Sequence, residues 1–201
     1  MAGPGRRCHT LQPRVVASEN RQTEFGPFMH DRCMDMDDDA RYRVLLARDA
    51  RWDGRLFFAV LTTGIYCRPI CPSRTPKRTS VRFFQSPAAA QKAGFRPCLR
   101  CRPEVSPQVL NWRGPSHTVA RALRMIEAGV LDEGNVGHLA AKLGIGERQL
   151  RRRFAQQIGA SPVAVAQTRR VLFAKQLLHE TNLSMTDVAL AAGFGSVRRF
   201  N

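Results

Sequence analysis

Residues 67–71 read CRPIC and residues 98–101 read CLRC, so Cys67, Cys71, Cys98 and Cys101 form two close pairs separated by 26 residues. Each pair can bind one ion from two sides, and four thiolates are a frequent ligand set for Zn²⁺. A redox dithiol would account for one pair but would leave the second unexplained. The spacing therefore predicts one zinc ion held by four cysteines, which usually serves to stabilise a small fold.

The cysteine pairs lie in the most basic part of the chain. Between Gly54 and Pro103 there are ten Arg and Lys residues and no Asp or Glu. Four of these cations stand close to the first pair in sequence, where they can hold phosphate oxygens: Arg68, Arg74, Lys77 and Arg78. A solvated basic surface is the competing explanation. A zinc-bound thiolate is also a nucleophile for carbon that needs no adjacent His, so the residues alone leave a structural and a reactive site open.

The composition of the whole chain points to a polyanionic partner. Its 201 residues include 32 Lys and Arg against 16 Asp and Glu, a formal net charge of +16, which favours nucleic acid. No apolar run approaches the ~20 residues that a bilayer span requires, so we expect no membrane association. No apolar segment follows the arginines near the N-terminus, which argues against a secretion signal. We therefore expect a cytoplasmic protein with reduced cysteines.

The pattern of the first half predicts an α+β fold that begins with a small zinc-stapled α/β module. Residues 1–40 lack periodicity and are expected to be disordered. Within the module, residues 41–104, the apolar runs at 55–61 and 81–84 predict two strands. Ser86 and Pro87 predict the start of a short helix that ends at Gly94 and leads to the second cysteine pair. A module of ~60 residues buries little core, so the metal should supply much of its stability.

The second half predicts an all-α domain over residues 117–201, joined by a linker over 105–116 that is rich in proline. Helical periodicity begins at Val119, recurs around 136–143 and, after a glycine turn, gives way to an Arg-rich helix from Glu147. This order is typical of a helix-turn-helix unit. The second helix of that unit carries the residues expected to contact base edges and phosphates: Arg148, Gln149, Arg151 and Arg152.

A second helix-turn-helix unit is expected near the C-terminus. A long helix should run from Ser161-Pro162 to about residue 180, with Leu172, Phe173 and Leu177 facing inward. Ser184 opens a capping box that predicts the next helix. A further helix begins at Ser196, and the sequence ends at residue 201, one or two turns into it. We therefore expect the second unit to be incomplete.

Two blocks of the sequence resemble one known family. WDGRLFFAVLTTGIYCRPICPSRTPKR at 52–78 and QKAGFRPCLRCRPE at 91–104 are similar to the amino-terminal zinc domain of the Ada DNA-repair proteins. Residues 119–201 resemble the AraC-type regulatory domain that follows it there. The resemblance implies a single-turnover (suicide) methyltransferase that takes the methyl group of a methylphosphotriester in DNA. It also implies that methylation turns the protein into a transcription factor of the alkylation response.

The resemblance also implies roles for single residues. Cys67 corresponds to the methyl acceptor, with Cys71, Cys98 and Cys101 as the other zinc ligands, and Thr63 and Arg74 match positions near the phosphate. Double-stranded DNA, as alkylated backbone and as promoter sites, and RNA polymerase are the expected partners of a monomer. Some members of the family continue into an O6-methylguanine methyltransferase domain or a 3-methyladenine glycosylase domain, and the motifs of neither occur in this sequence. We therefore expect this chain to be part of such a fusion protein.

Two other hypotheses remain beside the methyl acceptor. One is an AraC-type transcription regulator whose zinc module is purely structural. The other is a non-functional remnant whose final third does not fold. Thioether formation on a zinc ligand would reduce the negative charge of the site, so under the first hypothesis methylation should strengthen binding to the DNA backbone, by about 1 kcal/mol or more.

Overall fold

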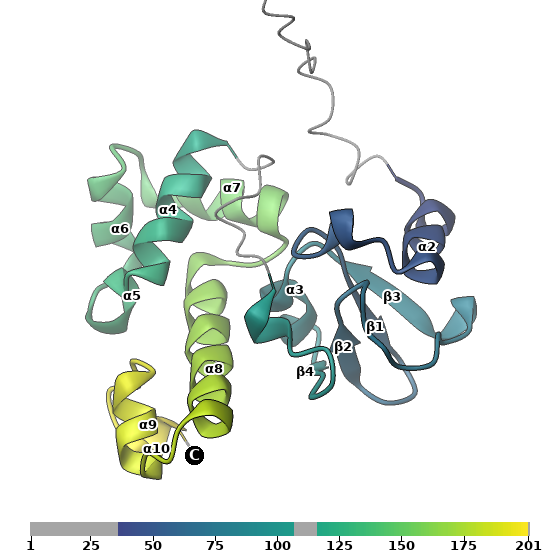
Figure 1. The fold of residues 1–201 in the computed structure, drawn as a ribbon. Helices are drawn as coiled ribbons and strands as arrows, with labels where there is room; N and C mark the ends of the chain where they lie inside the picture. The colour runs from purple at the N-terminus through teal and green to yellow at the C-terminus, as the bar shows by residue number, and fades with distance from the viewer. Residues whose placement is uncertain (1–35, 107–115, 201) are drawn as a thin grey trace, which may run out of the picture.

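The computed structural model describes residues 36–106 and 116–200, which form a cysteine-rich N-terminal module and a helical domain (Figure 1). Of the segment 1–40 that was expected to be disordered, residues 1–35 lie outside the described residues, as does most of the expected linker, whereas residues 38–40 are helical. The module begins earlier than the sequence predicted, with helix α2 (Asp38–Ala47). Asp37 caps this helix by accepting a hydrogen bond from the Ala40 N–H at 2.6 Å, and the acidic first turn suits the positive end of the helix dipole.

The module is built on a four-stranded sheet in the order β3-β1-β2-β4. Its strands are β1 (Phe57–Val60), β2 (Ile65–Cys67), β3 (Val81–Phe84) and β4 (Arg96–Pro97). β1 pairs antiparallel with β2 and β3, whereas β2 and β4 are parallel. The strands predicted at 55–61 and 81–84 are confirmed as β1 and β3. β2 and β4 were not predicted, because segments of two or three residues show no periodicity.

Both faces of this sheet are buried, which explains the unbroken apolar run of β1. On one face, Phe58 lies opposite Cys67 and packs with Leu45 of α2 and the other cysteines. On the other face, Phe57 and Tyr66 pack against helix α3 (Pro87–Lys92). The predicted helix from Ser86 is confirmed, since the Ser86 hydroxyl accepts a hydrogen bond from the Ala89 N–H. Short 3₁₀ turns complete the module at Ala50–Trp52, Arg78–Ser80 and Pro103–Val105.

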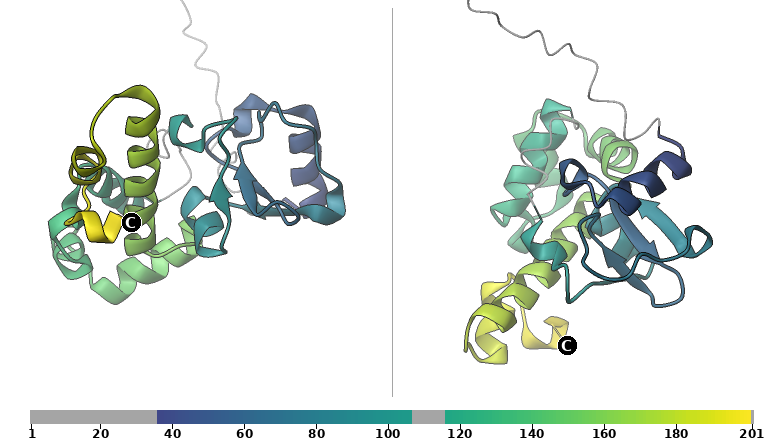
Figure 2. Two further views of the ribbon diagram at one scale, coloured as in Figure 1. Left: turned by 90° about the horizontal axis from the view of Figure 1, so that it is seen from below. Right: turned by 45° about the vertical axis from the view of Figure 1, so that its right-hand side comes forward.

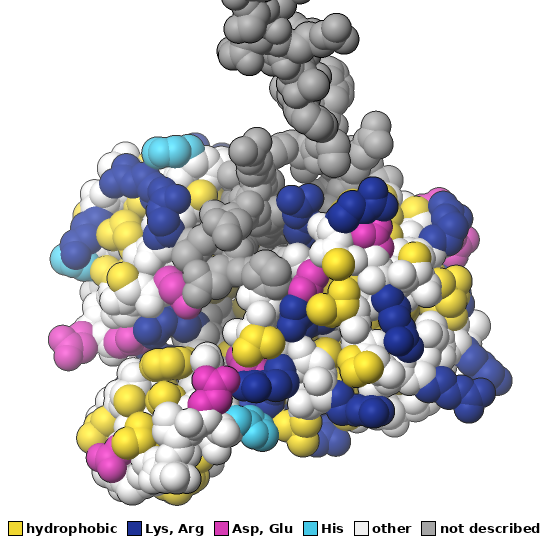
Figure 3. Space-filling view, in the orientation of Figure 1, with side chains coloured by type: hydrophobic (Ala, Val, Ile, Leu, Met, Phe, Trp, Pro, Cys, Tyr) yellow, Lys and Arg dark blue, Asp and Glu magenta, His cyan; other side chains and the backbone are white. Residues whose placement is uncertain are grey.

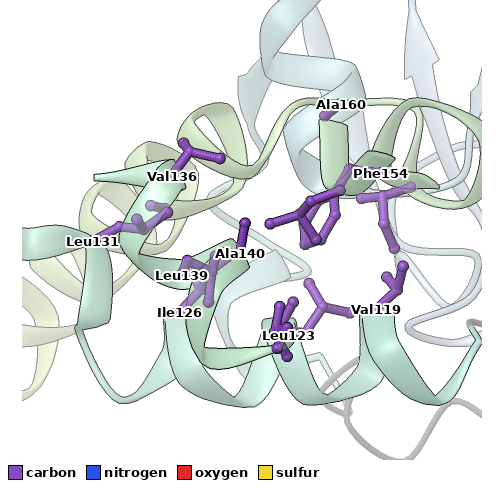
Figure 4. Packing of buried hydrophobic residues seen from close by; sticks show 14 of the residues in the cluster. Val119, Leu123, Ile126, Leu131, Val136, Leu139, Ala140, Phe154 and Ala160 are labelled. Atoms are coloured by element: carbon purple, nitrogen blue, oxygen red, sulfur yellow. The ribbon is translucent and has the colours of Figure 1, made fainter. Parts of the chain in front are cut away.

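The helical domain contains the predicted first helix-turn-helix unit. Its helices are α4 (His117–Glu127), α5 (Val130–Glu133), α6 (Val136–Lys142) and α7 (Glu147–Ile158). Val119, Leu139 and Phe154 lie in one common core, each with no measurable exposure (Figure 4). The turn from α6 to α7 passes through Gly144, whose φ of 69° suits glycine. The 3.6-residue periodicity of the sequence therefore identified the α4 and α6 residues of this core correctly.

Helix α8 (Pro162–Glu180) leads to the second unit, α9 (Met185–Ala191) and α10 (Val197–Phe200). Ser161 and Ser184 cap α8 and α9 as predicted. Ala174 and Val188 are buried between α8 and α9. The prediction that Phe173 faces inward was wrong, because its side chain is 37% exposed. Ala174, one residue further, takes the buried position, and Leu172 and Leu177 are only partly buried.

Helices α3 and α8 bring the two parts of the chain together, and both views of the fold place α8 beside the module (Figure 2). The Ser86 hydroxyl donates to the carbonyl of Ile158 at 2.8 Å, so the residue that caps α3 also binds the end of α7. A Cβ atom added at Gly159 would lie 3.2 Å from the Cβ of Ala89, which shows how closely the two segments approach. No helix within the described ranges has the length and hydropathy needed to cross a bilayer.

Candidate metal centre and DNA interface

The four cysteines converge on one point in the interior of the module. Cys67 ends β2, and a tight turn in which the Cys71 N–H donates to the Arg68 carbonyl at 3.0 Å returns Cys71 to it. Cys98 follows β4, and its N–H donates to the Tyr66 carbonyl at 3.0 Å, which places the second pair beside the first. All four sulfur atoms lie within 4.8 Å of one another, and all four residues are buried.

This donor set fits a zinc ion. Zn–S bonds of about 2.3 Å in a tetrahedron place sulfur atoms about 3.8 Å apart, which is compatible with the observed cluster. Hydrogen bonds of the Cys67 thiol to the sulfurs of Cys101 and Cys71, together with burial, raise the pKa of Cys67 far above its usual range when no cation is bound. Bound Zn²⁺ keeps such sulfurs deprotonated, so Cys67, Cys71, Cys98 and Cys101 form a metal centre.

Arg68 does not belong to the exposed basic group in which the sequence placed it. Its side chain is 9% exposed and forms an ion pair with Asp53, which is 7% exposed. Its backbone N–H donates to the Cys101 sulfur at 3.4 Å, and its Nη1 donates to the Cys101 carbonyl at 3.1 Å. Because its guanidinium is used internally, Arg68 supports the loop of the second cysteine pair and is not part of the exposed basic surface.

The other cations of the module differ in their availability. Arg74, Lys77 and Thr63 are exposed, as an interface with DNA requires. Arg78 is half-buried, pairs with Asp38 and Asp39, and stacks near aromatic rings. Lys and Arg side chains are spread over the visible surface of the module, at the right of the view in Figure 3.

A small cavity lies between the first cysteine pair and two arginines. It has a volume of about 30 Å³, and Cys67, Cys71, Arg48 and Arg74 contribute to its lining. The sequence did not single out Arg48, which ends α2 in a left-handed conformation with φ of 47°. Its guanidinium donates to the Ser73 carbonyl at 3.1 Å, which brings α2 to the loop after the first cysteine pair. No local pattern could have revealed this contact across 25 residues.

In the helical domain, the residues predicted to contact DNA lie along α7. Arg148, Arg151 and Arg152 are exposed and Gln149 is partly buried. Arg148, Gln149 and Arg152 line one surface hollow with Gly146, so these three side chains share a face. Arg151 forms an ion pair with Glu147 at 2.6 Å, one turn earlier on the same helix.

Sequence comparison agrees with this two-part organisation. Residues 40–104 match the family described as the metal binding domain of Ada, and residues 139–201 match a helix-turn-helix domain family. A Bacillus subtilis protein, the bifunctional transcriptional activator/DNA repair enzyme AdaA, is 31% identical over 81% of this chain and 74% of its own length. The fold and the cysteine centre thus define a zinc-binding module joined to a helix-turn-helix domain. The chain belongs to the Ada family.

Other relatives extend beyond this chain. The probable bifunctional transcriptional activator/DNA repair enzyme AlkA of Mycobacterium tuberculosis is 49% identical over 86% of this chain, which spans about a third (34%) of that protein. A solved structure of the DNA methyl phosphotriester repair domain of E. coli Ada is 50% identical, covering 34% of this chain and 74% of that domain, with a TM-score of 0.32.

Proposed function

We propose that Cys67 irreversibly accepts the methyl group of a methylphosphotriester in double-stranded DNA, and that the methylated protein binds DNA more tightly as a transcriptional regulator. The cavity beside the metal centre carries this proposal, because Cys67 and Cys71 line it with two arginines whereas Cys98 and Cys101 do not. The resemblance to the Ada family selects Cys67 of these two. The names of the relatives agree with it, since they combine transcriptional activation with DNA repair.

Hydrogen bonding distinguishes the sulfurs by nucleophilicity. The Cys101 sulfur accepts a hydrogen bond from the backbone N–H of Arg68. The pKa of Cys71 is lowered chiefly by its hydrogen bonds with Cys101 and Cys67, and further by hydrogen bonds with Ser73. Such donors stabilise a thiolate and draw electron density from it. Within residues 36–106 and 116–200, no N–H group donates a hydrogen bond to the Cys67 sulfur. Its lone pairs are therefore more available for attack on carbon than those of Cys101.

Access separates the first cysteine pair from the second. Cys67 and Cys71 line the cavity of about 30 Å³ with Arg48 and Arg74, whereas Cys98 and Cys101 do not. A space of this size accepts a group like a water molecule or a methyl group. A phosphotriester brought to the mouth of the cavity would meet the two arginines with its neighbouring phosphates and the Cys67 sulfur with its methyl group. Thr63 and Lys77 are exposed nearby in sequence and extend the proposed interface.

The reaction is a displacement at carbon. A lone pair on the Cys67 sulfur forms the S–C bond while the C–O bond of the phosphotriester breaks, and the phosphodiester anion leaves with the electron pair. Bound zinc supplies a sulfur that is already a thiolate at neutral pH. No general base is needed, and no group in the described part of the site can hydrolyse a thioether, so each protein molecule reacts once.

The product has a different charge from the reactant. Loss of one thiolate makes the metal centre one unit less negative, which weakens its repulsion of the DNA backbone. The helical domain would then bind promoter DNA through α7, where Arg148, Gln149 and Arg152 share a face. If one unit of charge acts like one phosphate contact, binding gains about 1 kcal/mol and depends on salt.

Intact-mass measurement tests this proposal. The zinc-loaded protein is incubated with DNA methylated on its phosphates, and unmethylated DNA is the control. We expect the mass of one methyl group to be added, and peptide fragmentation should place it on Cys67. A Cys67→Ala variant that still folds with zinc should gain nothing. An unchanged mass of the wild-type protein, or a methyl group on another residue, would refute the proposal; unchanged mass with intact DNA binding would favour a regulator with a purely structural zinc module.

A further inference from the structure

Helix α8 of the helical domain contacts the backbone of the metal centre itself. Lys175 reaches from α8 to the carbonyl of Cys98 at 3.4 Å and to both carboxylate oxygens of Glu104 at 2.7 Å. The Glu104 side chain is 1% exposed and that of Lys175 is 12% exposed. A buried carboxylate requires a partner, and the main cationic partner of this one comes from 71 residues away.

A second chain of hydrogen bonds joins α8 to the first cysteine pair. The Thr168 hydroxyl donates to the side-chain oxygen of Gln91 at 3.1 Å, and the Gln91 amide donates to the Tyr66 hydroxyl at 3.0 Å. Tyr66 directly precedes Cys67 and is fully buried, and Thr168 is 6% exposed. One helix is therefore connected to both halves of the ligand set, through different side chains.

We propose that Lys175 and Thr168 are positioning residues for the zinc centre, so that the helical domain completes the support of the metal site. Groups in the outer shell of a metal site orient its ligands, and their loss typically lowers metal affinity 10- to 100-fold. Lys175 holds the loop of the second cysteine pair through Cys98 and Glu104. Thr168 holds the residue before Cys67 through Gln91. The consequence for methyl transfer rests on the proposed function, but the consequence for zinc retention does not.

Zinc release from the full-length, zinc-loaded protein to a colorimetric chelator tests the proposal in the absence of DNA. We expect Lys175→Met to release zinc about tenfold faster than the wild-type protein. The matched control is Lys142→Met, which removes an exposed lysine from α6 in the same domain and should leave the rate unchanged. The double variant Lys175→Met/Glu104→Gln should recover much of the lost retention, because a neutral amide no longer needs the cation.

Thr168→Val tests the second chain of hydrogen bonds independently, because it removes the hydroxyl that binds Gln91 with almost no change in side-chain shape. It should accelerate release several-fold, and its effect should multiply with that of Lys175→Met because the two side chains act on different cysteine pairs. Cobalt substitution adds a spectroscopic readout, since a displaced ligand alters the visible bands of Co²⁺ bound by four thiolates. Release rates and cobalt spectra equal to the wild type in both single variants would overturn the proposal.

Two further results keep this test separate from methyl transfer. Far-ultraviolet circular dichroism should show unchanged helix content in the variants; if Lys175→Met fails to fold, Thr168→Val decides the question. If the wild-type protein accepts no methyl group but Lys175→Met still loses zinc faster, the proposed function fails and the positioning role stands. If the wild type accepts methyl and both variants retain zinc normally, only the positioning role fails.

Discussion

The buried ion pair between Arg68 and Asp53 offers a quantitative test of how the metal centre is supported. Asp53→Asn keeps the shape of the side chain but removes its charge, so it leaves the Arg68 guanidinium buried, 9% exposed, without its anionic partner. Removing one partner of a buried pair typically costs about 3–5 kcal/mol. We expect a loss of this size in the free energy of unfolding of the zinc-loaded module, because the hydrogen bond at 2.7 Å from Arg68 Nε to Asp53 is charge-assisted.

Guanidinium unfolding followed by tryptophan fluorescence measures this loss, since Trp52 directly precedes Asp53. Asp49→Asn is the matched control. It also removes a carboxylate that binds an arginine, but its partner Arg51 is 87% exposed, and asparagine can still cap the 3₁₀ turn. The control should change stability far less, because the Arg51 guanidinium that loses its partner remains solvated. Equal effects of the two substitutions, or a loss below about 1 kcal/mol for Asp53→Asn, would refute the reasoning.

Three more predictions concern the metal, the helical core and the loss of stability at low pH. Chelation of zinc should unfold residues 36–106 while the core of α4–α7 keeps its protection, which hydrogen exchange with mass spectrometry can resolve. Phe154→Ala should cost about 3–5 kcal/mol in thermal or denaturant unfolding, because this side chain is completely buried. Burial alone would raise the pKa of Glu104, but hydrogen bonds from Lys175, the backbone and Arg102 lower it below its usual value. Its stabilising contribution is therefore present above the unfolded pKa and lost as the pH falls through the folded pKa. In a Glu104→Gln variant, the free energy of unfolding should decrease less steeply as the pH is lowered. An unchanged dependence on pH would contradict this prediction.

The helical half was predictable because its signals are local. Val119, Leu123 and Ile126 recur at helical spacing, and the serine caps act within three residues. The strands β2 and β4 were missed because they depend on partners elsewhere in the sheet. The start of α2 was missed although its cap, Asp37, is a local signal. Phe173 shows the limit of periodicity. The pattern predicts which residues form an apolar face on a helix, but not which other element packs against that face.

The basic residues show a second limit. Sequence proximity grouped Arg68 with Arg74 and Lys77, yet Arg68 points inward to Asp53 while the other two are exposed. The stretch from 54 to 103 has no acidic residue, but Asp53 and Glu104 flank it and fold back onto Arg68 and Lys175. The charge of a sequence therefore indicates a polyanionic partner, but not which Lys and Arg side chains contact it.

Ligand spacing, turn chemistry and helical period were enough to predict four cysteines on one metal ion in a basic module, followed by helices with a helix-turn-helix pattern. All of these signals are short-range, so they can be read from the chain before it folds. The lining of the cavity by Cys67 with Arg48 and Arg74, and the contact of Lys175 on α8 with Cys98, became visible only in the folded protein. These contacts join residues tens of positions apart, and they exist only because the packing of α2 on the sheet and of α3 on α8 brings those residues together.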